Sequence, residues 1–155
     1  MGTTSSLPLD SATNGVTNPL NVDKLDTFEL TSSTTPDAQW VGQFFAYGGA
    51  GSQDSTVIYF AMPEGKRLGR HTDTAEETQY IIRGSGELLL DEGVKQIRAG
   101  DVFVIKQGTP HDLRNTGTGD LSIVAFFPAA QVEQHWTEDI WEPGNQKVTG
   151  TPNRS

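Results

Sequence analysis

The segment GRHTDTAEETQYIIRGSG, residues 69–86, carries a histidine, an aspartate, two adjacent glutamates and three glycines. If residues 77–83 form a strand, the alternation of side chains places Glu77 and Gln79 on one face and Tyr80 on the other. The segment therefore predicts a strand that directs a carboxylate and an amide towards the inside of a barrel.

The same segment and one later stretch add potential ligands. His71 and Asp73 share a face if the chain there is extended, and His111 shares a face with Leu113 on a later strand. Four potential ligands could then meet inside one barrel: His71, Asp73 and Glu77 from the first segment and His111 from the second. The alternative is a surface turn in which Asp73 only hydrogen-bonds His71, with His111 an ordinary turn or core histidine.

Outward from these residues, the chain consists of short apolar runs bounded by Gly, Pro, Asn or Asp. Its 155 residues suit one domain, and 17 glycines and 8 prolines are typical of strands joined by turns. We predict an all-β fold, an antiparallel sandwich or barrel with hairpins at 84–86 and 91–93. The roughly nine predicted strands lie at 27–30, 38–47, 55–62, 78–84, 86–93, 94–101, 102–108, 111–117 and 121–127.

The composition divides the chain into three parts. Residues 1–27 are rich in Thr, Ser, Asn and Pro, which predicts a flexible N-terminal arm, and 28–130 carry the strand pattern of the barrel. Residues 131–155 are polar again and form a C-terminal tail, which Trp136 and Trp141 could hold against the barrel. We expect about the last ten residues to be frayed.

Charge and composition exclude several classes of partner. A net charge of −9 and a pI near 4.6 argue against binding to nucleic acid or to an anionic membrane. The absence of cysteine excludes disulfides and thiolate ligands, so a metal would be held by nitrogen and oxygen. No apolar run near the start is long enough for a signal peptide or membrane span, and we expect a soluble, cytoplasmic protein.

Around His71, Glu77 and His111 the sequence resembles the cupin superfamily, in particular its small single-domain members with a type-2 conserved barrel. The first family motif, G-x5-H-x-H-x3-4-E-x6-G, and the second, G-x5-P-x-G-x2-H-x3-N, occur in the right order. The resemblance implies a double-stranded β-helix, or jelly-roll, barrel. The matching residues are Gly65, His71, Glu77 and Gly84 for the first motif and Gly100, Gly108, His111 and Asn115 for the second.

The sequence departs from the family pattern at two positions: Asp73 replaces the usual second histidine, and Lys106 replaces a proline. By family position, the resemblance implies one divalent metal ion, either Fe, Mn, Ni or Zn. The carboxylate of Asp73 favours Fe or Mn, or else marks a site that binds metal weakly or not at all. Glu76 competes with Glu77 for the last ligand position, but only Glu77 keeps the six-residue gap to the following glycine. The implied ligands are His71, Asp73, Glu77 and His111.

The string HTD followed by a later histidine is also similar to the facial triad of iron- and 2-oxoglutarate-dependent oxygenases. In that interpretation Glu77 is superfluous, and Arg114 lies too close to His111 to match the expected 2-oxoglutarate anchor. We therefore rank it below the cupin interpretation.

The resemblance implies a metal-dependent enzyme acting on a small oxygenated metabolite, with dioxygenase-type chemistry favoured. The alternatives are a redox-neutral cyclase, isomerase or lyase, and a non-catalytic protein that binds a small ligand. We predict that Glu77 and Gln79 act on the substrate, although Gln79 could equally satisfy backbone groups. A homodimer is expected from the resemblance, from the arm at 1–27 and from the many aromatic residues.

Overall fold

The computed structural model describes residues 15–152, and within this range it contains strands and short 3-10 helices but no α-helix. The part of the predicted arm before residue 15 lies outside the described residues. The helices are η1 (Val22–Lys24) and η2 (Gly48–Ala50). The strands are β1 (Phe28–Ser32), β2 (Gln39–Ala46), β3 (Thr56–Met62), β4 (His71–Asp73), β5 (Glu77–Arg83), β6 (Ser85–Leu90), β7 (Gly93–Arg98), β8 (Val102–Ile105), β9 (His111–Asn115), β10 (Leu121–Phe127), β11 (Glu133–Trp136), β12 (Trp141–Glu142) and β13 (Val148–Gly150).

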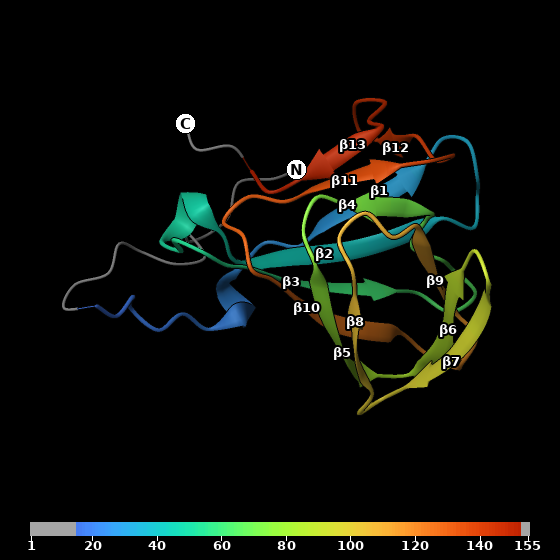
Figure 1. Ribbon diagram of the computed structural model, residues 1–155, viewed down its shortest axis with the longest axis horizontal. Helices are drawn as coiled ribbons and strands as arrows, with labels where there is room; N and C mark the ends of the chain where they lie inside the picture. The colour runs from blue at the N-terminus through green and yellow to red at the C-terminus, as the bar shows by residue number, and fades with distance from the viewer. Residues whose placement is uncertain (1–14, 153–155) are drawn as a thin grey trace.

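The strands form two sheets that face each other around the core (Figure 1). The seven-stranded sheet has the order β12-β1-β2-β3-β10-β5-β8, and the six-stranded sheet has the order β13-β11-β4-β9-β6-β7. Within each sheet, neighbouring strands are antiparallel. The predicted all-β, jelly-roll fold is confirmed.

Each strand predicted from the sequence has a counterpart, and the structure adds β4 and the three strands of the C-terminal segment. Residues 148–150, expected to be frayed, pair with β11. The predicted hairpin at 91–93 is present, because Leu90 pairs with Gly93 between β6 and β7. The predicted hairpin at 84–86 is wrong: β5 and β6 belong to different sheets, so the chain changes sheet there.

Gly84 makes this change of sheet possible. Its φ of 88° lies in the left-handed region, which glycine enters without steric cost. A Cβ atom at this position would also lie 2.4 Å from the carbonyl oxygen of Asp120. The chain therefore needs glycine at the corner for both reasons.

The C-terminal segment contributes aromatic side chains to the core. Trp136 and Trp141 are buried, with ring centroids 5.0 Å apart, and both lie 6.2 Å from Trp40 of β2. The predicted contact of these two tryptophans with the barrel is therefore present. Because β11 pairs with β4, the segment also completes the sheet that carries His71.

A buried ionic cluster joins three distant parts of the chain around Arg67. The Nη1 atom of Arg67 lies 3.0 Å from Asp112 Oδ2 and 3.3 Å from Asp139 Oδ2, and its Nε atom lies 3.2 Å from Asp37 Oδ1. Ser32 donates a hydrogen bond of 3.0 Å to the other carboxylate oxygen of Asp139. The cluster thus ties the C-terminal segment to the barrel beside the strand of His111.

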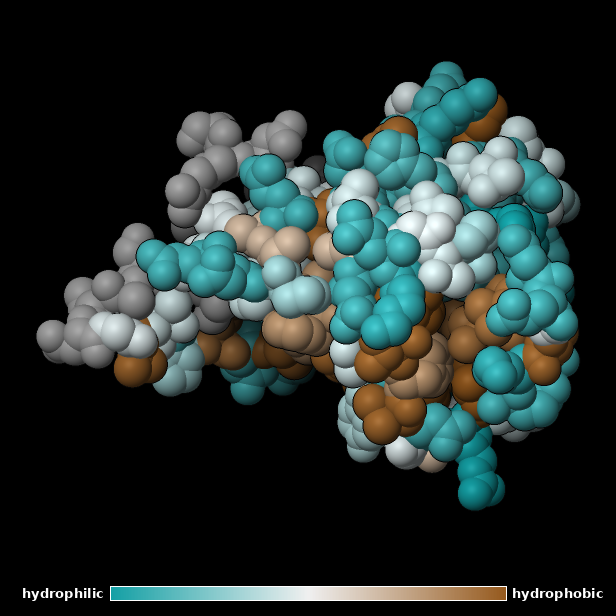
Figure 2. All heavy atoms as spheres, viewed as in Figure 1, coloured by the Kyte–Doolittle hydropathy of each residue, from teal (hydrophilic) through white to brown (hydrophobic). Residues whose placement is uncertain are grey.

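The outer face of the seven-stranded sheet exposes apolar side chains near its β8 edge. They are Tyr80 and Ile82 of β5, Val102 and Val104 of β8, and Phe126 of β10. Figure 2 shows hydrophobic residues gathered over β5 and β8 in the lower part of the view. In contrast, Phe60 and Phe127 are buried in the core.

Within residues 15–152, no helix has both the length and the apolar character needed to cross a bilayer.

Candidate metal centre

His71 and His111 lie opposite each other in the antiparallel pair β4–β9, with ring centroids 4.3 Å apart. Both side chains are buried. Asp73 is two residues after His71, so the pleat directs its carboxylate to the same side of the sheet. The structure therefore brings these three residues together, as the sequence predicted for residues sharing a face.

Glu77 and Gln79 approach from β5 of the facing sheet. Both are buried, whereas Tyr80 between Gln79 and Ile81 is exposed, so the predicted alternation is confirmed. The Oε1 atom of Glu77 lies 3.4 Å from His111 Nε2. Two strands of one sheet and one strand of the other thus converge on the same point.

Both histidines present the same nitrogen to this point. The Nδ1 atom of His71 lies 2.9 Å from the carbonyl oxygen of Gly69, and that of His111 lies 2.7 Å from the carbonyl oxygen of Thr109. A carbonyl accepts a hydrogen bond only from a protonated nitrogen, so Nδ1 is the donor and Nε2 is left to bind a cation. This is the tautomer of a histidine that binds a metal through Nε2.

The spacing of the potential ligand atoms fits a shared ion. Asp73 Oδ1 lies 3.5 Å from His71 Nε2, and Asp73 Oδ2 lies 3.3 Å from His111 Nε2. Two atoms each about 2.1 Å from a metal and at a tetrahedral angle to each other would be about 3.4 Å apart. The ligand atoms of His71, Asp73 and His111 all lie within 4.8 Å of one another, a group that does not include Glu77. The place of Glu77 as a fourth ligand stays a prediction.

Several polar atoms at this point have no hydrogen-bond partner among the described residues. They are both carboxylate oxygens of Asp73, Oε1 of Glu77, Nε2 of His111 and both amide atoms of Gln79. Unpaired buried polar atoms are costly, and buried charges are normally paired or bound to a metal. Two neutral imidazoles and two carboxylates carry a net charge of −2, which one divalent cation neutralises. The residues therefore fit a divalent metal ion.

The protonation equilibria reflect this crowding. Burial and the nearby charge of Glu77 raise the pKa of Asp73 to about 8. Burial lowers the pKa of His111, but Glu77 and Asp73 outweigh it and raise that pKa to about 9. Burial, together with the charge of His111, holds the pKa of His71 well below its ordinary value. Protons on Asp73 and His111 therefore compete with a cation for the same atoms.

A second layer of contacts fixes the two histidine strands. Asp112 Oδ1 accepts a hydrogen bond of 2.7 Å from the amide of Gly69, whose carbonyl holds His71. The other oxygen of Asp112 pairs with Arg67. Neither Asp112 nor Arg67 was predicted from the sequence; the position of Asp112 directly after His111 was the one available signal.

A small cavity of about 30 Å³ lies beside the ligand group. His71, Asp73 and Glu77 line it, which leaves room for a substrate atom or a water molecule next to them. Gln79 does not line this cavity, and its predicted role stays a prediction. The other lining residues are Trp40, Ile58, Phe60, Leu68, Phe127, Gln134 and Trp136.

The alternative residues considered from the sequence lie elsewhere. Glu76 is exposed and pairs with the exposed Lys106 at 3.4 Å, so Glu77 and not Glu76 faces the histidines. Arg114 contacts Asp37 at 3.4 Å, outside the ligand group. Both departures from the motif pattern now have a location: Asp73 is in the ligand group, whereas Lys106 is at the surface.

Three comparisons with known proteins agree with this architecture. Residues 58–127 match the family model described as a cupin domain. The chain is 33% identical over 92 residues to an acireductone dioxygenase of Gluconacetobacter diazotrophicus, covering 50% of this chain and 51% of that protein. It is 37% identical over 68 residues to an oxalate-binding protein of Thermotoga maritima, covering 43% of this chain and 55% of that protein. This chain thus spans about half the length of the curated relatives it matches.

Among solved structures, the protein Rru_A2000 of Rhodospirillum rubrum, described as a cupin-2 domain, superposes with a TM-score of 0.59. The sequence identity is 15%, and the superposition covers 67% of this chain and 69% of that one. At this identity the likeness concerns the fold alone. The two facing sheets, the two motifs and the matched family model together show that residues 58–127 of this chain form a cupin domain.

Proposed function

We propose that the chain is a metal-dependent enzyme acting on a small oxygenated metabolite, with dioxygenase-type chemistry favoured. The observation that carries this proposal is the buried group of His71, Asp73 and His111, whose ligand atoms lie within 4.8 Å of one another beside a cavity. The acireductone dioxygenase among the relatives supports the choice of chemistry.

The metal would be held by His71, Asp73 and His111, with Glu77 as the candidate fourth ligand. A bound divalent ion would supply Lewis acidity, and iron would in addition supply a redox-active centre. Two nitrogen ligands and carboxylate oxygen suit Fe²⁺ or Mn²⁺, the metals we favour over Ni²⁺ and Zn²⁺. The lining aromatic residues keep bulk water away from this group.

Glu77 is the residue placed to move a proton. Its Oε1 atom is buried, lacks a hydrogen-bond partner among the described residues and belongs to a residue that lines the cavity. If it does not bind the metal, it is the candidate base for a hydroxyl or an acidic C–H of the substrate. Gln79, directly behind it on β5, would orient that carboxylate or an oxygen of the substrate.

Elemental analysis and oxygen uptake test the proposal. Wild-type protein purified without a metal-binding tag and reconstituted with Fe²⁺ should bind about one equivalent, and His111→Ala and Asp73→Ala should lose it. Glu77→Gln should abolish turnover, whereas the matched control Glu76→Gln changes an exposed neighbour and should not. Cyclic enols and phenols are assayed in an oxygen electrode, with acireductone, suggested by that relative, as the open-chain comparison.

The outcomes separate the candidate functions. Oxygen uptake that depends on iron supports a dioxygenase, and turnover without oxygen uptake that Zn²⁺ also supports would indicate a redox-neutral cyclase, isomerase or lyase. Failure of the reconstituted wild type to take up any metal would overturn the enzyme proposal. The non-catalytic alternative, supported by the relative named as an oxalate-binding protein, would then be tested by oxalate titration.

A further inference from the structure

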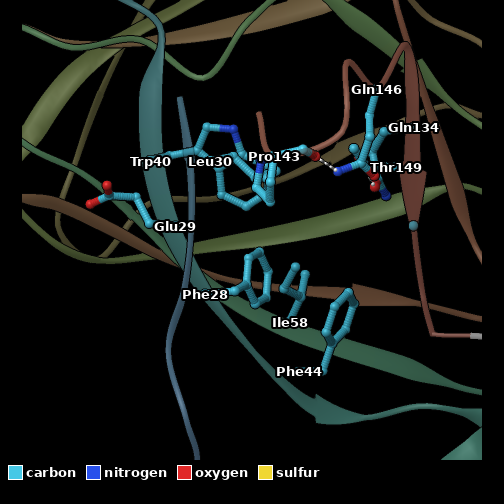
Figure 3. Close-up of a pocket in the computed structure, with 11 residues that line it drawn as sticks. Phe28, Glu29, Leu30, Trp40, Phe44, Ile58, Gln134, Pro143, Gln146 and Thr149 are labelled. Atoms are coloured by element: carbon cyan, nitrogen blue, oxygen red, sulfur yellow. Dashed lines mark hydrogen bonds between the residues drawn. The ribbon is translucent and has the colours of Figure 1, made fainter. Parts of the chain in front are cut away.

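A second cavity, of about 220 Å³, lies between β1–β2 and the C-terminal segment. We call it the apolar chamber. In Figure 3, Phe28, Ile58 and Phe44 lie side by side along one wall, and Gln134 and Thr149 lie across from them. The rings of Phe28 and Phe44 stack with centroids 5.3 Å apart, so this wall is aromatic.

The apolar chamber adjoins the metal centre. Trp40, Ile58 and Gln134 line both the chamber and the small cavity beside His71 and Asp73. Gln134 also pairs with Asp73 in the β11–β4 register. A molecule that occupies the chamber would therefore place one end next to the metal-binding residues.

The lining of the chamber disfavours charged ligands. Among the described residues that line it there is no lysine, arginine or histidine. Glu29 is the one charged residue of that lining, and Figure 3 shows its carboxylate directed away from the other side chains. An ionised group buried here would lack a partner, so the part of a ligand that enters the chamber is uncharged.

Trp40 adds one unsatisfied donor. The residue is 4% exposed, and its indole Nε1 has no hydrogen-bond partner among the described residues. Since a buried unpaired N–H costs free energy, an oxygen atom brought by a ligand would relieve that cost. The chamber thus combines aromatic walls with an unpaired N–H donor in a residue shared with the metal-side cavity.

We propose that the apolar chamber binds the uncharged ring system of an oxygenated substrate, with Trp40 Nε1–H donating to one of its oxygen atoms. The remaining oxygen atoms of the substrate would extend past Ile58 and Gln134 to the metal-binding residues. This last step rests on the proposed function, whereas binding of the ring does not. The substrate is accordingly an aromatic or cyclic ketone, phenol or enol and not a small dianion such as oxalate.

Calorimetric titration of metal-free protein with 2-naphthol, naphthalene and oxalate tests the chamber alone. We expect 2-naphthol to bind and oxalate not to bind. Trp40→Phe, which keeps a ring but removes the N–H, should weaken 2-naphthol about 3- to 10-fold and leave naphthalene unchanged. Trp141→Phe is the matched control, because Trp141 Nε1 is also buried and without a partner but does not line the chamber.

Phe44→Ala provides a second variant if Trp40→Phe fails to fold, since Phe44 is half-buried at the chamber wall. It should weaken 2-naphthol and naphthalene alike. The proposal is overturned if metal-free wild type does not bind 2-naphthol, or if Trp40→Phe and Trp141→Phe have equal effects. Binding of 2-naphthol by a protein that takes up no metal would support the chamber and overturn only the enzyme proposal. Metal uptake without 2-naphthol binding would overturn only the chamber.

Discussion

His71 and His111 are held in the same way: each donates its Nδ1 proton to the carbonyl oxygen two residues earlier, at Gly69 and Thr109. The two rings face each other across β4 and β9 with centroids 4.3 Å apart. Because the backbone itself holds each ring, the direction of both Nε2 atoms is fixed before a cation binds. A cation bound there would impose little reorganisation on the two imidazoles.

Replacing Asp73 should change which metal is bound. Asp73→Asn keeps the shape but removes the charge, so we expect metal affinity to fall by at least about tenfold. Asp73→His restores the usual family pattern and should retain one equivalent while shifting preference from Mn²⁺ towards Zn²⁺. Competition between equal concentrations of the two ions, followed by elemental analysis, measures this. Unchanged metal content and preference in both variants would exclude Asp73 as a ligand.

Metal binding should tighten as the pH rises. The pKa values of Asp73 and His111 in the metal-free protein are about 8 and about 9, so near pH 7 both groups hold protons that a cation must displace. Below about pH 8 a protonated Asp73 also spares the metal-free fold a buried charge, and that benefit is lost as the pH rises through 8.

The rise in Tm on adding Mn²⁺ should consequently be larger at pH 8 than at pH 6. Differential scanning calorimetry of metal-free and loaded protein at both pH values gives this difference. An equal rise at both would contradict proton competition. His111→Ala serves as the control, and its Tm should not respond to Mn²⁺ at either pH.

Removing the cation from the buried ionic cluster should destabilise the fold. In Arg67→Met, Asp112 and Asp139 lose their shared partner while remaining buried, which typically costs about 3–5 kcal/mol. Arg114→Met is the control, because Arg114 is half-buried and its partner Asp37 is equally accessible to solvent, so its loss should cost less than about 1 kcal/mol. Urea denaturation followed by tryptophan fluorescence measures both. Similar losses of unfolding free energy in the two variants would show that the Arg67 cluster does not stabilise the fold.

The predicted homodimer can be tested at the exposed apolar face. Val104 of β8 is 50% exposed on that face, and Val94 of β7 is 53% exposed in the other sheet. If a second copy covers the β5–β8 face, Val104→Lys should convert a dimer to a monomer in light scattering after gel filtration. Val94→Lys should not. A wild type that is already monomeric would show the expectation to be wrong.

The sequence predicted those features of the site that depend on the spacing of residues within one strand. Period-two alternation was enough to place Glu77 and Gln79 inside, and Glu76 was separated from Glu77 by its spacing to Gly84. Alternation says which side a residue faces but not which sheet its strand joins. For that reason the corner at Gly84 was mistaken for a hairpin.

The parts that escaped prediction depend on contacts between distant segments. The apolar chamber combines residues of β1–β3 with residues of β11–β13, and the Arg67 cluster spans residues 37–139. The C-terminal strands were not predicted because they are short and mostly polar. They contain too few apolar residues to show the alternation from which the other strands were predicted. Pairing with β4 and burial of Trp136 against His71, 4.4 Å from ring to ring, overrode that polar composition.

The pairing of β11 with β4 also means that the sheet carrying His71 is completed late during synthesis. His71 leaves the ribosome early, yet its neighbouring strand and the tryptophan packed on its ring are translated some sixty residues later. A nascent chain that lacks residues 133–136 leaves the edge of β4 open beside the ligand group. If the proposed metal binds, we infer that it would be loaded only after nearly the whole chain has left the ribosome.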